Sequence, residues 1–293
     1  MIDRISTHLR ALVGERHPLT SPAALLRTES YLTEEFRGNG WEVAPHAFEA
    51  LGGTYRNVVA TLPPPVPHLT SSPLRRTSCP PLIIGAHYDA VAGSPGADDN
   101  ASGLAVLLEV ARRLAEVSPS GPVHLIAFCL EEQNLLGSLA YAERLQARGE
   151  EIQGALILEC VGYTCSKPGS QRLPAGLPIE TPPVGDFLGV VGNQDSAGLL
   201  ASFEKAANRE VPSLKTVSLA VPGQGEAFPD TRRSDHAAFW HYGFPALMLT
   251  DTADYRNPHY HQPTDTLDTL DLEFMARVAE AVTAAVRVLS RSH

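Results

Sequence analysis

Short apolar runs alternate with helical patterns along most of the 293-residue chain, and this alternation constrains the fold more than any other feature. Runs rich in β-branched residues predict buried strands at 82–86, 123–130, 155–158, 187–191, 216–220 and 246–250. Helical spacing of apolar residues predicts helices at 21–38, 101–117, 137–148, 196–208 and 272–289, and a short one from Asp235. We therefore expect an α/β fold, in which a central, mostly parallel mixed sheet carries helices on both faces of a single domain over residues 1–293.

Two stretches without periodicity interrupt this pattern. Residues 63–81 are rich in Pro, Ser and Thr and follow a predicted strand pair, 41–48 and 54–62. The second stretch, 163–185, is rich in Pro and Gly. We interpret the first as a loop insertion within the domain, and we expect the second to enclose a substrate, because long loops beside a site often form its walls.

Composition and charge exclude several classes of function. A net charge of −10 with no stripe of Lys or Arg disfavours nucleic acid as a partner. The first 17 residues mix charges into an amphipathic pattern, which predicts neither a signal peptide nor a membrane span, and we expect a cytoplasmic protein. The four cysteines lack CxxC spacing and predict no disulfide framework, although Cys160 and Cys165 are close enough in sequence to pair.

The first polar cluster follows the predicted strand 82–86. His87 and Asp89 are two residues apart in an extended segment, so their side chains leave on the same side. A carboxylate placed in this way accepts a hydrogen bond from a metal-bound imidazole and fixes its tautomer. Glycines in the next loop permit a turn that returns Asp98 to His87. Taken alone, Asp98 and Asp99 fit a helix-capping pair as well as they fit a metal site.

Three further acidic residues end predicted strands. Glu131 and Glu132 directly follow the apolar run 123–130, where two carboxylates carry a desolvation cost unless a cation or a proton compensates it. Neighbours in an extended chain point in different directions, so one of the two can bind a metal while the other transfers a proton. Glu159 ends the next strand in the same way. A third acid at this sheet edge predicts two divalent ions and a metallohydrolase.

The segment 257–265 offers two histidines, His259 and His261, after the predicted strand 246–250. Alone, it fits a polar surface loop. With an acidic cluster at the neighbouring strand ends, one of the two histidines becomes a candidate metal ligand.

A serine hydrolase is disfavoured by the arrangement of its required residues. No Gly-x-Ser-x-Gly elbow is present, and Ser234, Asp235 and His236 are consecutive, so their side chains cannot line up as a relay. We expect these residues to open a short helix whose Phe239 and Trp240 pack inward.

In their order along the chain, these motifs resemble the dinuclear zinc aminopeptidases of peptidase family M28. The resemblance runs from about Asn57 to the C-terminal helix and rests on the following sequences: His87-x-Asp89, Gly-Ala-Asp98-Asp99-Asn-x-Ser-Gly, Phe128-x-x-Glu131-Glu132-x-x-x-x-Gly-Ser, Arg233-Ser-Asp-His, and Tyr260-His261 with Asp265-Thr266. It implies the zinc-exopeptidase fold and an enzyme that hydrolyses the N-terminal peptide bond of peptides.

The resemblance also implies a role for each matching residue. Asp98 would bridge two Zn²⁺ ions, His87 and Glu159 would complete one site, and Glu132 and His261 the other. Glu131 would be the general base, while Asp89 and Asp99 would support the ligands, with a cis peptide bond between Asp98 and Asp99. Tyr260 matches a tyrosine that supports the oxyanion in some members, and Arg233 matches an arginine on the substrate side.

One residue departs from the family pattern, in which most members carry Asp at the position of Glu159. The longer side chain changes the geometry of that site and admits Co²⁺ or Mn²⁺ in place of zinc. The alternatives are a glutaminyl cyclase-like acyltransferase with a single zinc ion, a carboxypeptidase or dipeptidase of the same fold, and a non-catalytic binding module. Retention of every ligand position speaks against the cyclase and the binding module. Peptide or aminoacyl substrates are the expected partners, with no membrane, and the oligomeric state stays open.

Overall fold

A mixed sheet of eight strands organises the part of the chain that the computed structural model describes, residues 1–62, 79–174, 176–177 and 179–290. The strands are β1 (Glu42–Ala50), β2 (Gly53–Thr61), β3 (Leu82–His87), β4 (Val123–Phe128), β5 (Gly154–Glu159), β6 (Leu188–Asn193), β7 (Thr216–Val221) and β8 (Ala246–Thr250). Their spatial order is β1-β2-β4-β3-β5-β8-β6-β7. Four neighbouring pairs are parallel, β4–β3, β3–β5, β5–β8 and β6–β7, and three are antiparallel. The predicted α/β class with a mostly parallel mixed sheet is confirmed.

The centre of the sheet is buried on both faces. Every residue of β3, β5 and β8 is buried, and so are five of the six residues of β4. Parallel strands covered by helices on both sides read as continuous apolar runs, which explains why these strands could be predicted from the sequence. At one end of the sheet, the predicted strand pair forms the antiparallel hairpin β1–β2. Most of the predicted loop 63–81 lies outside the described residues.

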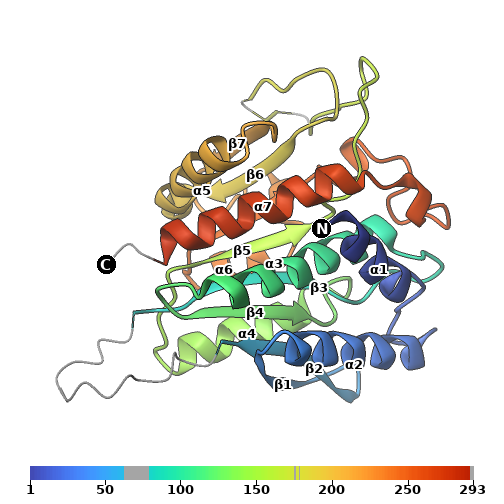
Figure 1. Cartoon of the computed structure of the whole chain (residues 1–293), viewed down its shortest axis with the longest axis vertical. Helices are drawn as coiled ribbons and strands as arrows, with labels where there is room; N and C mark the ends of the chain where they lie inside the picture. Colours follow the sequence, from blue (N-terminus) through green and yellow to red (C-terminus); the bar gives the residue numbers. More distant parts are fainter. Residues whose placement is uncertain (63–78, 175, 178, 291–293) are drawn as a thin grey trace.

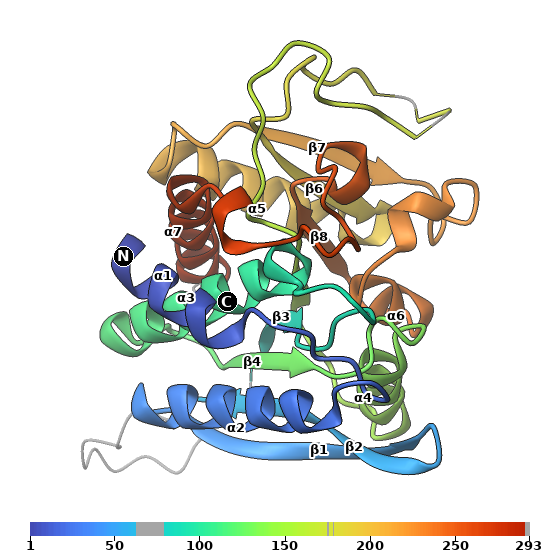
Figure 2. The same ribbon diagram turned by 90° about the vertical axis from the view of Figure 1, so that its right-hand side faces the viewer.

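Helices cover the two faces unequally. One face carries α1 (Ile2–Leu12), α2 (Pro22–Gly38), α3 (Gly103–Val117), α5 (Ala197–Glu210) and α7 (Leu272–Leu289), and the other carries α4 (Leu136–Ala147) and α6 (His236–His241). Figure 1 shows α7 and α3 lying in front of the sheet, and Figure 2 shows α4 and α6 on the opposite side from α7. Each face therefore has its own apolar core, and Phe239 and Trp240 of α6 pack into the smaller one.

The amphipathic N-terminal segment is the helix α1, which buries Ile5, Leu9 and Leu12 against α3 and α7. Arg16 follows it and is only 1% exposed. Its guanidinium donates hydrogen bonds to the backbone carbonyls of Leu12, Gly14, Tyr88, Pro95 and Gly96. Arg16 thus ties the N-terminal segment to the loop after β3, although burial lowers its pKa to about 10.

Two further observations concern membrane and disulfide chemistry. No helix among the described residues combines the length and the apolar content needed to cross a bilayer. All four cysteines are free, and Cys160 is buried whereas Cys165 is half-buried, so this pair does not form a bridge.

Candidate metal centre

The carboxyl ends of β3, β4 and β5 meet at one edge of the sheet, and the predicted metal ligands gather there. His87 is the last residue of β3, and Glu159 is the last residue of β5. Glu131 and Glu132 follow β4 after Cys129 and Leu130. His261 reaches the same place from the segment after β8. In α/β proteins, catalytic and ligand-binding sites usually lie beyond the carboxyl ends of the parallel strands.

Asp99 lies between the two histidines. Its Oδ1 is 3.1 Å from His87 Nε2, and its Oδ2 is 2.9 Å from His261 Nε2. The resemblance implied that Asp98 would occupy this central place, but the structure places Asp99 there instead. The predicted cis peptide bond is displaced in the same way, because it joins Asp99 to Asn100 rather than Asp98 to Asp99.

Asp98 points away from the histidines. Its Oδ1 accepts a hydrogen bond from the Gly162 amide at 2.9 Å, and its Oδ2 accepts one from Asn257 Nδ2 at 2.7 Å. The local turn begins at Gly96, which has a φ of +59° and where a Cβ would come within 2.4 Å of the Asp99 carbonyl oxygen, so this position requires glycine. Adjacent residues project in different directions, and the geometry of this turn decides which of the two acids faces the histidines.

Two groups of side chains share the bridging carboxylate of Asp99. In the first, His87 Nε2 is 3.4 Å from Glu159 Oε2 and 4.0 Å from Glu131 Oε2. In the second, His261 Nε2 is 3.3 Å from Glu132 Oε2. Apart from Asp98, every predicted ligand thus reaches the cluster, and the arrangement has the imidazole and carboxylate composition of a zinc site.

Unpartnered polar atoms test whether this cluster fits metal ions. Among the described residues, five buried atoms of the cluster make no well-aligned hydrogen bond: His87 Nε2, both carboxylate oxygens of Asp99, Glu132 Oε1 and His261 Nε2. Four of them face one another as the two imidazole–carboxylate pairs at 3.1 and 2.9 Å. Buried polar atoms without a partner are rare, because each costs about 1–3 kcal/mol. These five converge on one another from opposite sides of Asp99, so a pair of cations would satisfy all of them. The residues therefore fit a dinuclear metal site.

The electrostatics of the cluster lead to the same conclusion. Burial and neighbouring acids raise the pKa of Glu131 well above its usual range, and burial together with Asp99 raises the pKa of Glu132 to about 7. Burial lowers the pKa of His261, but Asp99 and Glu132 outweigh it and raise the value to about 10. Without cations these groups must share protons, because so many buried carboxylates cannot all be charged. Two divalent ions would remove that requirement.

The Asp89 carboxylate holds the two glutamates in place. Its two oxygens accept hydrogen bonds from the backbone N–H groups of Glu131 and Glu132, both at 3.1 Å. We predicted instead that this carboxylate would orient His87. His87 Nδ1 lies 3.2 Å from the backbone carbonyl oxygen of Asp89, within hydrogen-bond distance, and 3.7 Å from the carboxylate Oδ1. Either contact leaves Nε2 directed at Asp99.

Asp265 holds the backbone of Asp98 and Asp99, just as Asp89 holds the backbone of the two glutamates. It is fully buried, and its oxygens accept hydrogen bonds from the backbone N–H groups of Asp98 at 2.8 Å and Asp99 at 3.2 Å. The sequence contained Asp265 within the Tyr260-His261 motif but gave it no role. This contact could not be predicted from the sequence, because Asp265 lies 166 positions after Asp99 and only the fold brings the two residues together.

The run Ser234-Asp235-His236 has the structural role that we predicted, and it adds one contact to the site. His236 opens α6, and its Nε2 lies 2.7 Å from the Thr231 carbonyl oxygen. Ser234 is fully buried, and its hydroxyl donates a hydrogen bond to Glu159 Oε2 at 2.7 Å. Ser234 thereby fixes the orientation of the glutamate that departs from the family pattern.

Tyr260 and Arg233 lie beside the cluster. The Tyr260 ring stacks on His261 with 3.8 Å between ring centroids, and burial raises the pKa of its hydroxyl, which is therefore protonated. The Arg233 guanidinium lies 5.4 Å from the centre of the Tyr260 ring and donates a hydrogen bond to Asp254 Oδ1 at 2.8 Å. His259 is half-buried and contacts the hydroxyl of Thr264, so His261 is the histidine that joins the cluster.

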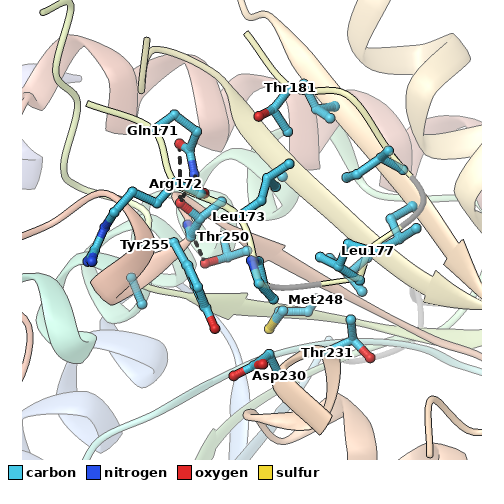
Figure 3. Close-up of a pocket in the computed structure, with 18 of the residues that line it drawn as sticks. Gln171, Arg172, Leu173, Leu177, Thr181, Asp230, Thr231, Met248, Thr250 and Tyr255 are labelled. Carbon is cyan, nitrogen blue, oxygen red and sulfur yellow. Dashed lines mark hydrogen bonds between the residues drawn. The ribbon is translucent and has the colours of Figure 1, made fainter. Parts of the chain in front are cut away.

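A cavity of about 90 Å³ adjoins the cluster: Glu159 belongs to both, and Arg233 and Tyr260 also line the cavity. Its floor is apolar and is formed by Phe187, Val191, Val217, Leu219 and Met248. The loop between β5 and β6 supplies a wall through residues such as Leu173, Leu177 and Ile179. Figure 3 shows Met248 between Leu177 of this loop and Tyr255. The stretch 163–185, which we expected to enclose a substrate, thus lines a cavity next to the candidate site.

Comparisons with known proteins show which family and fold the chain resembles. The family model described as "Peptidase family M28" matches residues 57–286. The uncharacterized protein YfbL of Escherichia coli is 35% identical over 96% of this chain and 86% of its own length. Curated aminopeptidases also match, but the chain spans only 40% to 58% of their length.

Two solved structures illustrate the likeness in three dimensions. LapA of Legionella is 20% identical and superposes with a TM-score of 0.74 over 99% of this chain and 73% of its own, which shows the fold. BSAP, a zinc aminopeptidase from Bacillus subtilis, is 26% identical with a TM-score of 0.59 over 80% of this chain and 50% of its own.

Proposed function

The chain belongs to peptidase family M28, and from that premise we propose that it is a zinc-dependent aminopeptidase that removes apolar residues from the N-terminus of peptides. The observation that carries the proposal is the convergence of two imidazoles and two glutamates on the Asp99 carboxylate, with five buried atoms that make no well-aligned hydrogen bond. We assign His87, Glu159 and Asp99 to one ion, and Glu132, His261 and Asp99 to the other. Two bound zinc ions would acidify a water molecule and polarise the scissile carbonyl.

Glu131 is suited to carry the proton of the reaction. Its carboxylate is 4.0 Å from His87 Nε2, farther than that of Glu159, and its surroundings raise its pKa. A carboxylate left over after the ligands are assigned can take a proton from the attacking water and return it to the leaving amine. Asp89 supports this role, because it fixes the backbone at Glu131 and Glu132.

Tyr260 is suited to stabilise the charge that develops on the carbonyl oxygen. Its hydroxyl is protonated and therefore able to donate a hydrogen bond, and its ring stacks on His261 and lies near the Arg233 guanidinium. A fixed donor of this kind acts in the transition state without reorganisation. Arg233 positions the tyrosine and lines the neighbouring cavity.

The cavity supports a preference for apolar N-terminal residues. At roughly 10–15 Å³ for each water-sized position, 90 Å³ corresponds to about six to nine positions, which is enough for a leucine, methionine or phenylalanine side chain. Glu159 lies on the wall that the cavity shares with the metal ligands. A side chain in the cavity would therefore leave the free α-amino group of the substrate beside the acidic cluster, where its positive charge is favoured.

Hydrolysis of leucine p-nitroanilide by the zinc-loaded protein tests the proposal. We expect turnover that a chelator abolishes and that zinc restores, with no cleavage of the N-acetylated substrate. Glu131→Gln should keep the zinc content and lose at least about a hundredfold in kcat, the lower range for general base catalysis. Glu151→Gln, a change at an exposed residue of the loop that precedes β5, serves as the control. Cyclisation of an N-terminal glutamine without anilide hydrolysis would support the acyltransferase instead, and retained activity in Glu131→Gln would overturn its assigned role.

A further inference from the structure

Arg256 is a buried cation that neither the candidate metal ligands nor the proposed chemistry uses. It is 5% exposed and lies in the segment after β8, one residue before Asn257. Its side chain faces the loop between β5 and β6 rather than the cluster, and it contacts Gln171, Tyr163 and Phe187. Since burial of an arginine is costly unless its contacts compensate, these contacts call for an explanation.

The contacts of Arg256 converge on the two ends of one loop wall. Its Nε donates a hydrogen bond to Gln171 Oε1 at 2.9 Å, and its guanidinium lies over the Phe187 ring at 4.5 Å from the centroid. Gln171 and Phe187 both line the apolar cavity. The Arg256 guanidinium therefore contacts both Gln171, near the start of the wall, and Phe187, at its end.

The base of the loop is closed around the Arg256 side chain. The Cys165 amide donates a hydrogen bond to the Gly185 carbonyl at 2.7 Å, which brings the two ends of the loop together. The stem of Arg256 then lies against Gly185, where a Cβ would come within 2.6 Å of its Cγ, Cδ and Nε atoms. Any side chain at position 185 would displace the arginine, so the fit depends on glycine here.

The same segment is fastened to the metal cluster. Asn257 donates a hydrogen bond to Asp98 at 2.7 Å, and Asp98 is adjacent to the bridging Asp99. The segment also holds the loop through its backbone, because the Tyr255 carbonyl accepts a hydrogen bond from the Arg172 amide at 2.8 Å. A continuous set of contacts thus connects the cavity wall with the backbone that carries the cluster.

We propose that Arg256 is a positioning residue for substrate selectivity, which fixes the loop 163–185 as the wall of the apolar cavity and thereby favours large apolar N-terminal residues. The inference rests on the proposed aminopeptidase function. Arg256 touches no part of the cluster, so it acts through Gln171 and Phe187. Its planar guanidinium is needed both for the stacking on Phe187 and for the hydrogen bond to Gln171, and a lysine cannot supply both.

Arg256→Met tests the proposal in the zinc-loaded, full-length protein. We expect the ratio of kcat/KM for leucine p-nitroanilide to that for alanine p-nitroanilide to fall about tenfold, the lower end of what a hydrophobic pocket contributes to discrimination. The loss should appear mainly in KM for the leucine substrate, with an unchanged zinc content. Arg256→Lys should recover only part of the ratio. Arg209→Met is the matched control and should leave the ratio unchanged. Arg209 is an exposed arginine of α5 that pairs with Glu210.

Limited trypsin digestion provides a second readout that does not depend on activity. The bond between Arg172 and Leu173 lies in the wall, and Arg172 is exposed. This bond should be cleaved several-fold faster in Arg256→Met than in the wild type or in Arg209→Met. If Arg256→Met does not fold, Gln171→Ala removes the partner in the loop and should show the same two effects.

The outcomes separate this inference from the proposed function. Equal losses for both anilides, with unchanged cleavage after Arg172, would overturn the positioning role and leave the aminopeptidase intact. A wild-type protein without activity on any aminoacyl anilide would refute the proposed aminopeptidase function. Trypsin cleavage after Arg172 that is no faster in Arg256→Met or in Gln171→Ala than in the wild type would independently refute the role of Arg256 in holding the wall.

Discussion

Replacement of Asp89 by Asn tests how the glutamate pair is held. The Asp89 carboxylate is fully buried and accepts two backbone hydrogen bonds at 3.1 Å, from Glu131 and Glu132. A hydrogen bond to a charged acceptor contributes about 1.5–3 kcal/mol. Asn keeps one acceptor oxygen but places an NH₂ group against the other backbone N–H. We therefore expect a loss of about 2–3 kcal/mol in the free energy of unfolding of the zinc-loaded protein.

The effect should depend on the metal, which makes the prediction specific. In the metal-free protein the substitution also removes one negative charge from a crowded acidic cluster, and this relief offsets part of the lost hydrogen bonding. Urea unfolding followed by circular dichroism, with saturating zinc and with chelator, measures both values. The exposed Asp195→Asn change is the control and should stay within about 0.5 kcal/mol of the wild type. If Asp89→Asn destabilised the metal-free protein as much as the zinc-loaded one, or neither of them, this role of Asp89 would be refuted.

Three further changes probe separate parts of the molecule. Ser234→Ala removes the donor to Glu159, so one of two zinc ions should dissociate about tenfold more readily in a competition titration with a chelator, while the other is unaffected. Leu219→Trp should fill the apolar cavity and lower kcat/KM for leucine p-nitroanilide about tenfold more than for the alanine substrate, whereas equal losses would argue against the cavity as the side-chain site. Glu109→Gln should lower the free energy of unfolding at pH 7 by about 1–2 kcal/mol. Burial raises the pKa of Glu109, but Arg4 and Arg112 outweigh it and lower the pKa from 4.5 to about 2. Solvent screening at the half-exposed Arg4 reduces the stabilisation that this shift implies. Because the unfolded chain binds the proton first, this contribution is present above pH 4.5 and disappears as the pH falls toward 2; a difference from wild type that stays constant over that range in acid unfolding curves would contradict the assignment.

Much of the fold could be predicted from the sequence because its central strands are buried on both faces. Uninterrupted apolar runs such as 82–86 and 246–250 fit only a strand of this kind when helices follow them. The predicted C-terminal helix 272–289 coincides with the range of α7, and the structure shows that the Asp271 side chain caps its first turn by accepting a hydrogen bond from the Phe274 amide. The N-terminal helix α1 was recognised only as amphipathic, since its short apolar stripe gains stability from packing against α3 and α7.

The site was predictable in composition but not in every position. The strand ends identified His87, Glu131, Glu132 and Glu159, because polar residues after buried strands meet at one edge of the sheet. The choice between Asp98 and Asp99 depended on a turn at Gly96 whose course no local pattern reveals. The supporting contacts of Asp265 and Arg256 join segments that are distant in sequence, so they become visible only in the folded chain.

Anomalous diffraction at the zinc absorption edge, from crystals of the zinc-loaded protein, would locate the metal ions themselves. We expect two peaks per chain on either side of the Asp99 carboxylate, each about 2.0–2.2 Å from one of its oxygens. One peak should also contact His87 and Glu159, and the other His261 and Glu132. A single peak, or two peaks that share the Asp98 carboxylate while Asp99 binds neither, would contradict a dinuclear centre bridged by Asp99.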